Sequence, residues 1–221
     1  ILATFRSDST WPGINYQDVS REAFEHRIHY TNLVLLAQAY RHPASAYFSN
    51  KKVKQTLTAA LAFWVRNDFI CDNWWYNQIG TPDNLTTVML LVGEELPKAL
   101  VARTQPIIGR AHLTASGARP SGDRIKIAGI LAKHLLFIGD RNALHNVIRV
   151  IESEIKFTTG RRGMQHDYSF HHREDRVNNT LSYGQGYAET FAEWAAWVAG
   201  TEYAFATEKI NQLIDYYLDG M

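Results

Sequence analysis

The 221-residue chain has little of several features that would fix its class at once. Its single cysteine, Cys71, excludes an internal disulfide and carries no metal motif. The formal net charge is only +1 and no basic stripe is present, which argues against a nucleic-acid partner. No apolar run approaches the length of a membrane span, so we expect no membrane partner either. A nucleophile elbow of the Gly-x-Ser-x-Gly type and the kinase motifs are also missing from the sequence.

What the sequence does contain is mostly helical periodicity. Seven segments with apolar residues at helical spacing or with capping signals are expected to form helices, namely Val19–Tyr40, Asn50–Asn67, Thr81–Leu91, Arg124–Ile138, Asn142–Lys156, Tyr187–Val198 and Thr207–Leu218. No convincing period-two strand pattern emerges. Helices of this length with short connections predict an all-α protein, either a bundle or a toroid of antiparallel helix hairpins. Three irregular stretches, Ile70–Gly80, Arg110–Gly122 and Gly160–Gly186, are where functional residues are expected.

Aromatic residues are plentiful, with six Trp, eleven Tyr and ten Phe. The segment from Asn73 to Gly80 places Trp74, Trp75 and Tyr76 in a row, and successive helical side chains point about 100° apart. At least one of the three is therefore expected to be exposed or to line a groove. Indole faces stack on sugar rings and amides bind hydroxyls, so the segment predicts either a carbohydrate platform or an aromatic packing corner.

A second polar cluster lies between Gly163 and Tyr187, where three His, two Tyr and two Arg precede an amphipathic helix. A buried segment would not gather so many polar groups, because each needs a partner. Tyr183, between Ser182 and Gly184, can transfer protons if nearby cations stabilise its phenolate. A metal site is the alternative; its candidate ligands are His166, Asp167, His171 and His172, although their spacing matches no standard zinc motif.

A third segment, Ser116–Arg124, opens a helix with glycines and arginines. Backbone N–H groups at the helix start, assisted by Arg119 and Arg124, could hold an anion. The segment matches neither the P-loop nor the dinucleotide fingerprint, so a plain capped loop is the simpler interpretation.

These residues resemble the hyaluronate lyase, chondroitin AC lyase and xanthan lyase family of polysaccharide lyases. The likeness is carried, in the family's order, by Asp8–Tyr16, Asn73–Pro82, Gly122–Ala128 and the stretch from Gly163–His172 to Ser182–Gly184. The resemblance implies an incomplete (α/α) toroid, no cofactor, and β-elimination at the uronic acids of an acidic polysaccharide. It further implies a secreted or periplasmic protein.

The resemblance also implies a role for each matching residue. Tyr183 is the acid/base, with His172 as the preferred partner and His171 as the second choice. The aromatic patch that stacks the substrate comprises Asn73, Trp74 and Trp75.

Asp123 stands where the family has an asparagine that binds the substrate carboxylate. An ionised aspartate would repel a uronate unless it is protonated or paired with Arg124. Asn178 and Asn179 are the alternatives for that role.

The chain is expected to be one toroid domain, residues 1–221, cut from a longer protein. The family places catalytic arginines just after a segment like Tyr216–Met221 and continues into β-sandwich domains, which we expect as the chain's own C-terminal partners. Three hypotheses follow: the catalytic helical domain of a lyase, a carbohydrate-binding domain without turnover, and a metal-dependent glycan-active enzyme.

Overall fold

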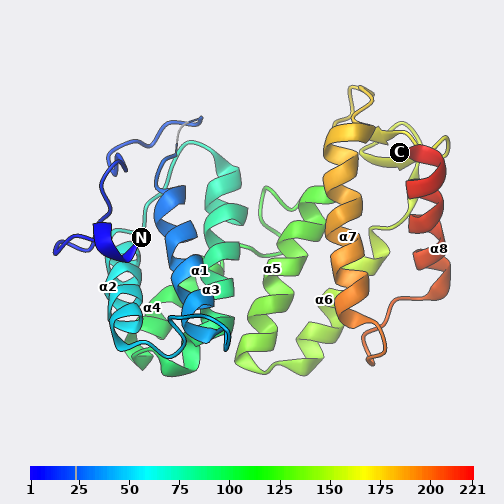
Figure 1. Cartoon of the computed structure of the whole chain (residues 1–221). Helices are drawn as coiled ribbons and strands as arrows, with labels where there is room; N and C mark the ends of the chain where they lie inside the picture. Colours follow the sequence, from blue (N-terminus) through cyan, green and yellow to red (C-terminus); the bar gives the residue numbers. More distant parts are fainter. Residues whose placement is uncertain (23) are drawn as a thin grey trace. The chain divides into compact units, whose positions relative to one another are not determined.

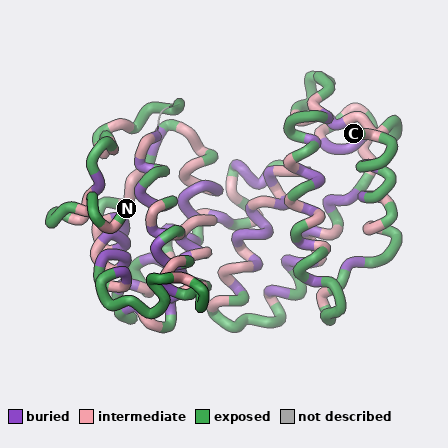
Figure 2. Tube along the Cα trace, in the orientation of Figure 1, coloured by how far each residue is buried: buried purple, intermediate pink, exposed green. Residues whose placement is uncertain are grey.

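The structure is a computed structural model that describes residues 1–22 and 24–221. Helices dominate it, and the chain divides into two compact units, Ile1–Ala111 and His112–Met221 (Figure 1). In each unit, buried residues run along the helices and exposed residues gather in the connecting loops (Figure 2). The two units are described separately below.

The first unit is built from four α-helices that pack as neighbouring hairpins, with α1 against α2 and α3, and α3 against α4. Their bounds are α1 Arg27–Arg41, α2 Lys51–Asn67, α3 Thr81–Val92 and α4 Lys98–Ile108. Short 3₁₀ turns occupy Leu2–Thr4 and Gly93–Glu95. The helix α4 was not predicted, and Pro106 within its last turn interrupts the pattern by which such a helix is usually identified.

Helix α2 begins and ends where the sequence predicts. The Asn50 side chain accepts hydrogen bonds from the backbone N–H groups of Lys52 and Val53, at 2.9 and 3.2 Å. This satisfies two of the donors that a helix start leaves without a partner. Asp68 then closes the helix in a left-handed conformation, with φ of 46°.

The predicted helix Val19–Tyr40 is wrong in its first part, because α1 begins only at Arg27. The preceding polar groups bond to loop backbone instead of continuing a helix. The Glu25 carboxylate accepts from the backbone N–H of Asn15 at 2.7 Å, and Asp18 accepts from the N–H of Ser20 at 2.9 Å. Residue 23 of the predicted helix lies outside the described residues.

A buried histidine, His29, lies at the centre of the first unit's core. Its ring is fully buried beside Trp11 and Trp64. Nε2 lies 3.0 Å from the carbonyl oxygen of Ala60, so Nε2 carries the proton and Nδ1 accepts from the hydroxyl of Tyr16 at 2.8 Å. Both ring nitrogens of the neutral imidazole are therefore satisfied, and burial lowers the pKa of His29 to about 4.

We expect the stability of the chain to fall on mild acidification because of His29. The unfolded histidine takes up a proton near pH 6.5 and the folded one only near pH 4, so acid favours the unfolded state across that window. With each tenfold change in proton affinity equal to about 1.4 kcal/mol, the free energy of unfolding falls by about 3 kcal/mol. Urea unfolding between pH 7 and pH 4 measures this, and His29→Gln should give a shallower pH dependence. Parallel curves for the two proteins would contradict the assignment.

The second unit combines four α-helices with a small sheet. The helices are α5 Gly122–Ile138, α6 Arg141–Ser153, α7 Gln185–Val198 and α8 Thr207–Asp215. Strand β1 (Phe157–Thr158) pairs in parallel with β2 (Gly163–Gln165), and β2 pairs antiparallel with β3 (Phe170–His171). The sequence did not predict this sheet, because strands of two or three residues are too short to show alternation. A π-helical turn, Thr180–Gly184, leads into α7, and another, Tyr216–Gly220, follows α8.

Two boundaries of the second unit illustrate why its helices could be predicted. Gly139 ends α5 in the left-handed conformation that glycine adopts without steric cost, with φ of 77°. Asp140 then caps α6 by accepting a hydrogen bond from the N–H of Ala143 at 3.0 Å. The core behind these helices holds the fully buried aromatic rings of Phe170, Tyr187 and Tyr216.

Helices α5 and α7 approach closely at Gly129. A Cβ atom built there would lie 2.7 Å from the Nε1 atom of Trp194, whose side chain is almost fully buried. We expect Gly129→Ala to lower the free energy of unfolding by about 2 kcal/mol through overpacking, although alanine is the better helix former. Gly186→Ala on α7 is the matched control: nothing lies within 4 Å of its Cβ position, so a gain of about 0.5–1 kcal/mol is expected. Urea midpoints that move in the same direction for both variants would contradict the predicted contact.

None of the helices among residues 1–22 and 24–221 has both the length and the apolar character needed to cross a membrane.

Candidate active site

The second unit presents Tyr183 at the end of the π-helical turn Thr180–Gly184. Thr180 fixes the start of the turn: its hydroxyl accepts from the backbone N–H of Phe170 at 3.0 Å and donates to the Asn178 side chain at 2.7 Å. The N–H of Gly184 donates to the carbonyl of Asn179 at 2.9 Å. The turn is thereby tied to strand β3, while the Tyr183 side chain remains 52% exposed.

Gly184 is required by packing behind the turn. A Cβ atom there would collide with the hydroxyl of the buried Tyr216 and would lie 2.9 Å from the Cβ of Phe170. A glycine allows close approach to the backbone because it has no Cβ atom. In the structure the atoms closest to Gly184 belong to the buried side chains of Phe170 and Tyr216. The turn therefore packs directly on the core, and Tyr183 remains exposed on its outer side.

His172 lies directly against Tyr183. The two ring centroids are 3.5 Å apart and the ring planes differ by 3°, so the rings are stacked face to face. His171 instead lines a separate pocket of about 380 Å³ together with His166 and Arg176, and its Nδ1 is buried without a hydrogen-bond partner. Of the two adjacent histidines, the structure brings only His172 together with the tyrosine ring.

Burial lowers the pKa of His172 below the usual value of 6.5. The Asp123 carboxylate acts in the opposite direction, whereas the guanidinium groups of Arg162, Arg173 and Arg119 add to the lowering. The imidazole is therefore neutral near pH 7, as a group must be if it is to accept a proton or a hydrogen bond.

Asp123 is ion-paired, but not with the arginine that the sequence suggested. Its Oδ2 accepts from Nη2 of Arg162 at 3.0 Å, and the two side chains are only 11% and 13% exposed. Arg124, the expected partner, faces Glu154 instead at 3.4 Å. Of the two conditions under which Asp123 would not repel a uronate, protonation or pairing with Arg124, the second is not met in the structure. Glu154 also accepts from the backbone N–H of Ser121 at 2.6 Å and holds Arg124 on that side of the helix start.

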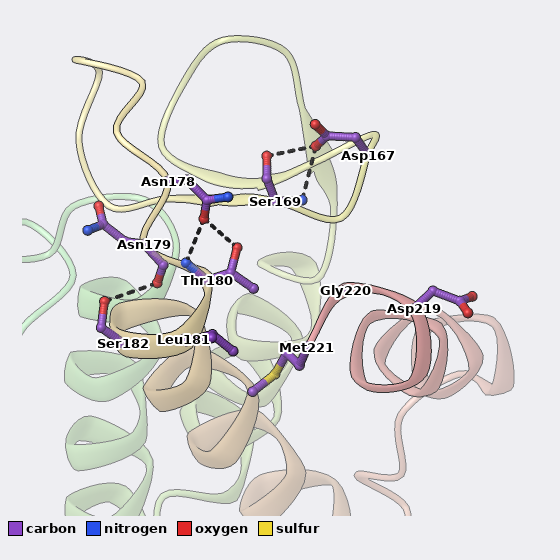
Figure 3. Close-up of a pocket in the computed structure, with 10 residues that line it drawn as sticks. All are labelled: Asp167, Ser169, Asn178, Asn179, Thr180, Leu181, Ser182, Asp219, Gly220 and Met221. Atoms are coloured by element: carbon purple, nitrogen blue, oxygen red, sulfur yellow. Dashed lines mark hydrogen bonds between the residues drawn. The ribbon is translucent and has the colours of Figure 1, made fainter.

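The two candidate asparagines line a different pocket, of about 640 Å³, with Asp219 and Met221 on its other side (Figure 3). The Asn178 side-chain oxygen accepts from both the N–H and the hydroxyl of Thr180, at 2.9 and 2.7 Å. Asn179 accepts from Ser182 through its backbone carbonyl (Figure 3). Asn178 therefore has a structural task at the start of the turn.

The aromatic patch belongs to the first unit and is helical rather than a loop. Residues from Trp74 onward wind through a π-helical turn, Tyr76–Gly80, into α3, so α3 begins at Thr81 as predicted but is preceded by helical backbone that the sequence did not predict. The N–H of Thr81 donates to the carbonyl of Tyr76, five residues back, and Pro82 follows without a donor of its own.

Within this patch, one side chain supports the backbone through hydrogen bonds and another is exposed to solvent. Asn73 is engaged at both ends: Nδ2 donates to the carbonyl of Arg21 at 3.1 Å and Oδ1 accepts from the N–H of Trp75 at 3.0 Å. Trp75 is 37% exposed and stands edge-on to Tyr76. Trp74 is half-buried. An exposed indole beside a fixed amide has the form of a sugar-stacking surface.

The four residues of the metal hypothesis do not converge on one point. His166 stacks on Phe157, with ring centroids 5.0 Å apart, and the Asp167 carboxylate accepts from the N–H and hydroxyl of Ser169. His172 is stacked on Tyr183. Among the described residues, 1–22 and 24–221, no group of three or more His, Cys, Asp or Glu side chains is arranged to hold a metal ion.

Comparison with known proteins places the chain in a family. Residues 4–220 match the model of the N-terminal α-helical domain of polysaccharide lyase family 8. The chain belongs to this family. It is 26% identical over 221 residues to chondroitinase-AC of Pedobacter heparinus, covering 99% of this chain and 31% of that protein. The resemblance drawn from the sequence is thereby confirmed.

Solved structures of chondroitin AC lyases and of a xanthan lyase share the fold. A structure of chondroitinase AC lyase from a study of its oligosaccharide complexes superposes with a TM-score of 0.90 at 26% identity, over 99% of this chain and 32% of that one. The Streptomyces coelicolor A3 chondroitin AC lyase in complex with chondroitin sulphate gives 0.82 at 19% identity, over 99% and 30%. A Paenibacillus xanthan lyase gives 0.78 at 19%, over 97% and 20%. The expected fold class, an incomplete (α/α) toroid, is confirmed, and the chain spans about a third of the length of its chondroitinase relatives.

The candidate site of this chain contains one group that the sequence did not single out. Arg162 lies in an Arg-Arg-Gly sequence before β2 and is 39 residues from its partner Asp123. Neither residue carries a signal of the pairing, because the contact depends on the loop before β2 returning to the start of α5.

Proposed function

We propose that the protein carrying this chain cleaves uronic-acid-containing acidic polysaccharides by β-elimination, with Tyr183 as the acid/base and His172 as its partner. The observation that carries the proposal is the stacked Tyr183–His172 pair, in which the charges of Arg162, Arg173 and Arg119 act on the His172 ring. Membership of family 8 and the chondroitinase AC relatives support the reaction class.

β-Elimination requires three functional groups, a cation, a base and an acid, and the second unit contains candidates for each. A cation must offset the charge of the uronate carboxylate, since this makes the adjacent C5 proton acidic enough to leave. A base must take that proton, and an acid must protonate O4 as the C4–O4 bond breaks. A tyrosine can do both in sequence: its phenolate takes the C5 proton, and the resulting hydroxyl delivers one to O4. The neutral His172 ring is stacked on one face of the tyrosine and holds its ring in position.

The aromatic patch of the first unit is proposed to bind the sugar rings. Trp74 and Trp75 supply stacking faces, and Asn73 holds the turn that presents them. The substrate class follows from the relatives, of which the Streptomyces coelicolor enzyme was solved with chondroitin sulphate. A secreted or periplasmic location is part of the same proposal, because such polymers lie outside the cell. The proposal also includes C-terminal β-sandwich domains in the protein that carries this chain.

The direct test is product formation. The protein carrying this chain is incubated with hyaluronan, chondroitin and other uronans, and the ultraviolet absorbance of an unsaturated uronate is followed. A steady rise on at least one polymer is expected. If none of the polymers gives unsaturated product, the lyase proposal fails.

A carbohydrate-binding domain without turnover is the rival that the exposed Trp75 supports. It predicts that the polymer is retained in affinity electrophoresis and that no product forms. Trp75→Ala should weaken retention under either hypothesis, so only the product assay separates them. Activity that disappears with a chelator and returns with metal would instead favour the metal-dependent alternative.

A further inference from the structure

Arg162 lies opposite His172 across the small sheet, because the next residue, Gly163, pairs with His171 in the antiparallel register of β2 and β3. The charges of Arg162, Arg173 and Arg119 act on the protonation of His172 in one direction and that of Asp123 in the other. The surroundings of the stacked pair are therefore positive on balance. A local excess of cations is what an anionic substrate group needs, because the chain as a whole has a net charge of only +1.

Among these groups, Arg162 and Asp123 are the two that form a nearly buried ion pair. Removing both charges from water costs free energy that their attraction does not reliably recover, so such a pair is a poor device for stability. Buried charged groups placed beside a candidate acid/base are more typical of functional sites. Asp123 lies in the first turn of α5, and its hydrogen bond fixes one end of the Arg162 guanidinium.

We propose that Arg162, held in position by Asp123, is the cation that binds the uronate carboxylate next to Tyr183 and His172. This inference rests on the proposed β-elimination. A guanidinium offers five N–H donors in a planar fork, and Arg162 donates to Asp123 through Nη2 alone. Its Nε is buried without a hydrogen-bond partner, so the ion pair with Asp123 leaves this guanidinium incompletely satisfied, as expected of a group whose second partner is a ligand.

The arrangement also resolves the problem posed by an aspartate at position 123. An unpaired, ionised Asp123 would repel a uronate. Paired with Arg162, it instead orients a cation towards the reacting centre. The substrate's C5 proton then passes to Tyr183, the electron pair of the C5–H bond moves onto the carboxyl group, and Arg162 balances the negative charge that develops there until the C4–O4 bond breaks.

The other candidates for this role are less well placed. The Asn178 side-chain oxygen is committed to Thr180, and both Asn178 and Asn179 line the pocket next to Asp219 (Figure 3). Arg124 faces Glu154. Arg173 is exposed in the loop after β3 and bears on His172 only through its charge.

The test compares an acidic substrate with its neutral ester. Unsulfated chondroitin oligosaccharides and their uronate methyl esters are given to the wild-type protein, to Arg162→Gln and to the control Arg161→Gln, an adjacent exposed arginine. Removing a charge-assisted hydrogen bond of about 1.5–3 kcal/mol corresponds to a loss of about 10- to 150-fold. We expect Arg162→Gln to lose that much kcat/KM on the acid and little on the ester, while Arg161→Gln resembles the wild type on both.

An equal loss on acid and ester would overturn the proposal, because a purely structural role of Arg162 would affect both substrates alike. No loss on either would overturn it too. Asp123→Asn provides a second variant that retains the Arg162 guanidinium and an amide oxygen to accept its hydrogen bond: it should still prefer the acid over the ester. If that preference disappears while Arg162→Gln retains it, Asp123 and not Arg162 recognises the acid group.

Binding separates this inference from the proposed reaction. Calorimetric titration of the wild-type protein with the same acid and ester oligosaccharides requires no turnover. Tighter binding of the acid that is lost in Arg162→Gln supports the role of Arg162 even if no unsaturated product forms. Equal affinity for acid and ester in the wild type refutes it even if the protein proves to be a lyase.

Discussion

Tyr183→Phe is expected to lower kcat by about 10³- to 10⁴-fold while leaving substrate affinity close to that of the wild type. The hydroxyl is the only group removed, and it is the group proposed to carry the proton both from C5 and to O4. The phenylalanine ring retains the stack on His172, whose centroid lies 3.5 Å away, and the side chain is already half-exposed, so no core packing is lost. The effect should therefore appear in kcat rather than in KM.

Initial rates of unsaturated-product formation, together with calorimetric affinity for the same oligosaccharide, measure both halves of this expectation. Tyr217→Phe is the control, because Tyr217 is another partly exposed tyrosine of the second unit and has no proposed role in proton transfer. A Tyr183→Phe protein with near wild-type kcat would remove Tyr183 from the mechanism. An equal loss in both tyrosine variants would point to a general effect of hydroxyl removal.

The helices of this chain could be predicted where their ends carry local signals. Asn50 bonds to two N–H groups within three residues of itself, and Gly139 adopts the conformation that stops a helix. Such signals act over a few residues and are written in the sequence itself. The segment before Arg27 had helical periodicity but no such start, and there Glu25 and Asp18 bond to loop backbone instead.

The residues of the candidate site also differ in whether a local sequence signal identifies them. Tyr183 and the histidines could be found because they cluster within one stretch of sequence. The choice of His172 over His171 needed the direction in which each side chain leaves the end of β3, and a strand of two residues gives no pattern from which to read that direction. The Asp123–Arg162 pair joins residues 39 positions apart, so only the folded chain reveals it.

The absence of an ion pair between Asp123 and Arg124 has a simple geometric reason. Adjacent residues of a helix point about 100° apart, so an ion pair between them is unfavourable. Arg124 instead turns towards Glu154, which is almost fully buried and also binds the N–H of Ser121. Helical geometry alone disfavoured the pairing, whereas the identity of the true partner depended on tertiary structure.

His172→Asn is expected to lower kcat by about 10²-fold, and His171→Asn to leave it nearly unchanged. Only His172 stacks on Tyr183, whereas His171 lines a separate pocket with His166 and Arg176.

Because burial lowers the pKa of His172, its ring stays neutral until the pH falls below the usual histidine value of 6.5. In the wild type the acidic limb of the kcat profile should therefore lie below pH 6.5, and it should vanish from the residual activity of His172→Asn. Steady-state rates across this pH range for both variants decide the matter: a larger loss in His171→Asn, or an acidic limb retained without His172, would assign the partner role to another group.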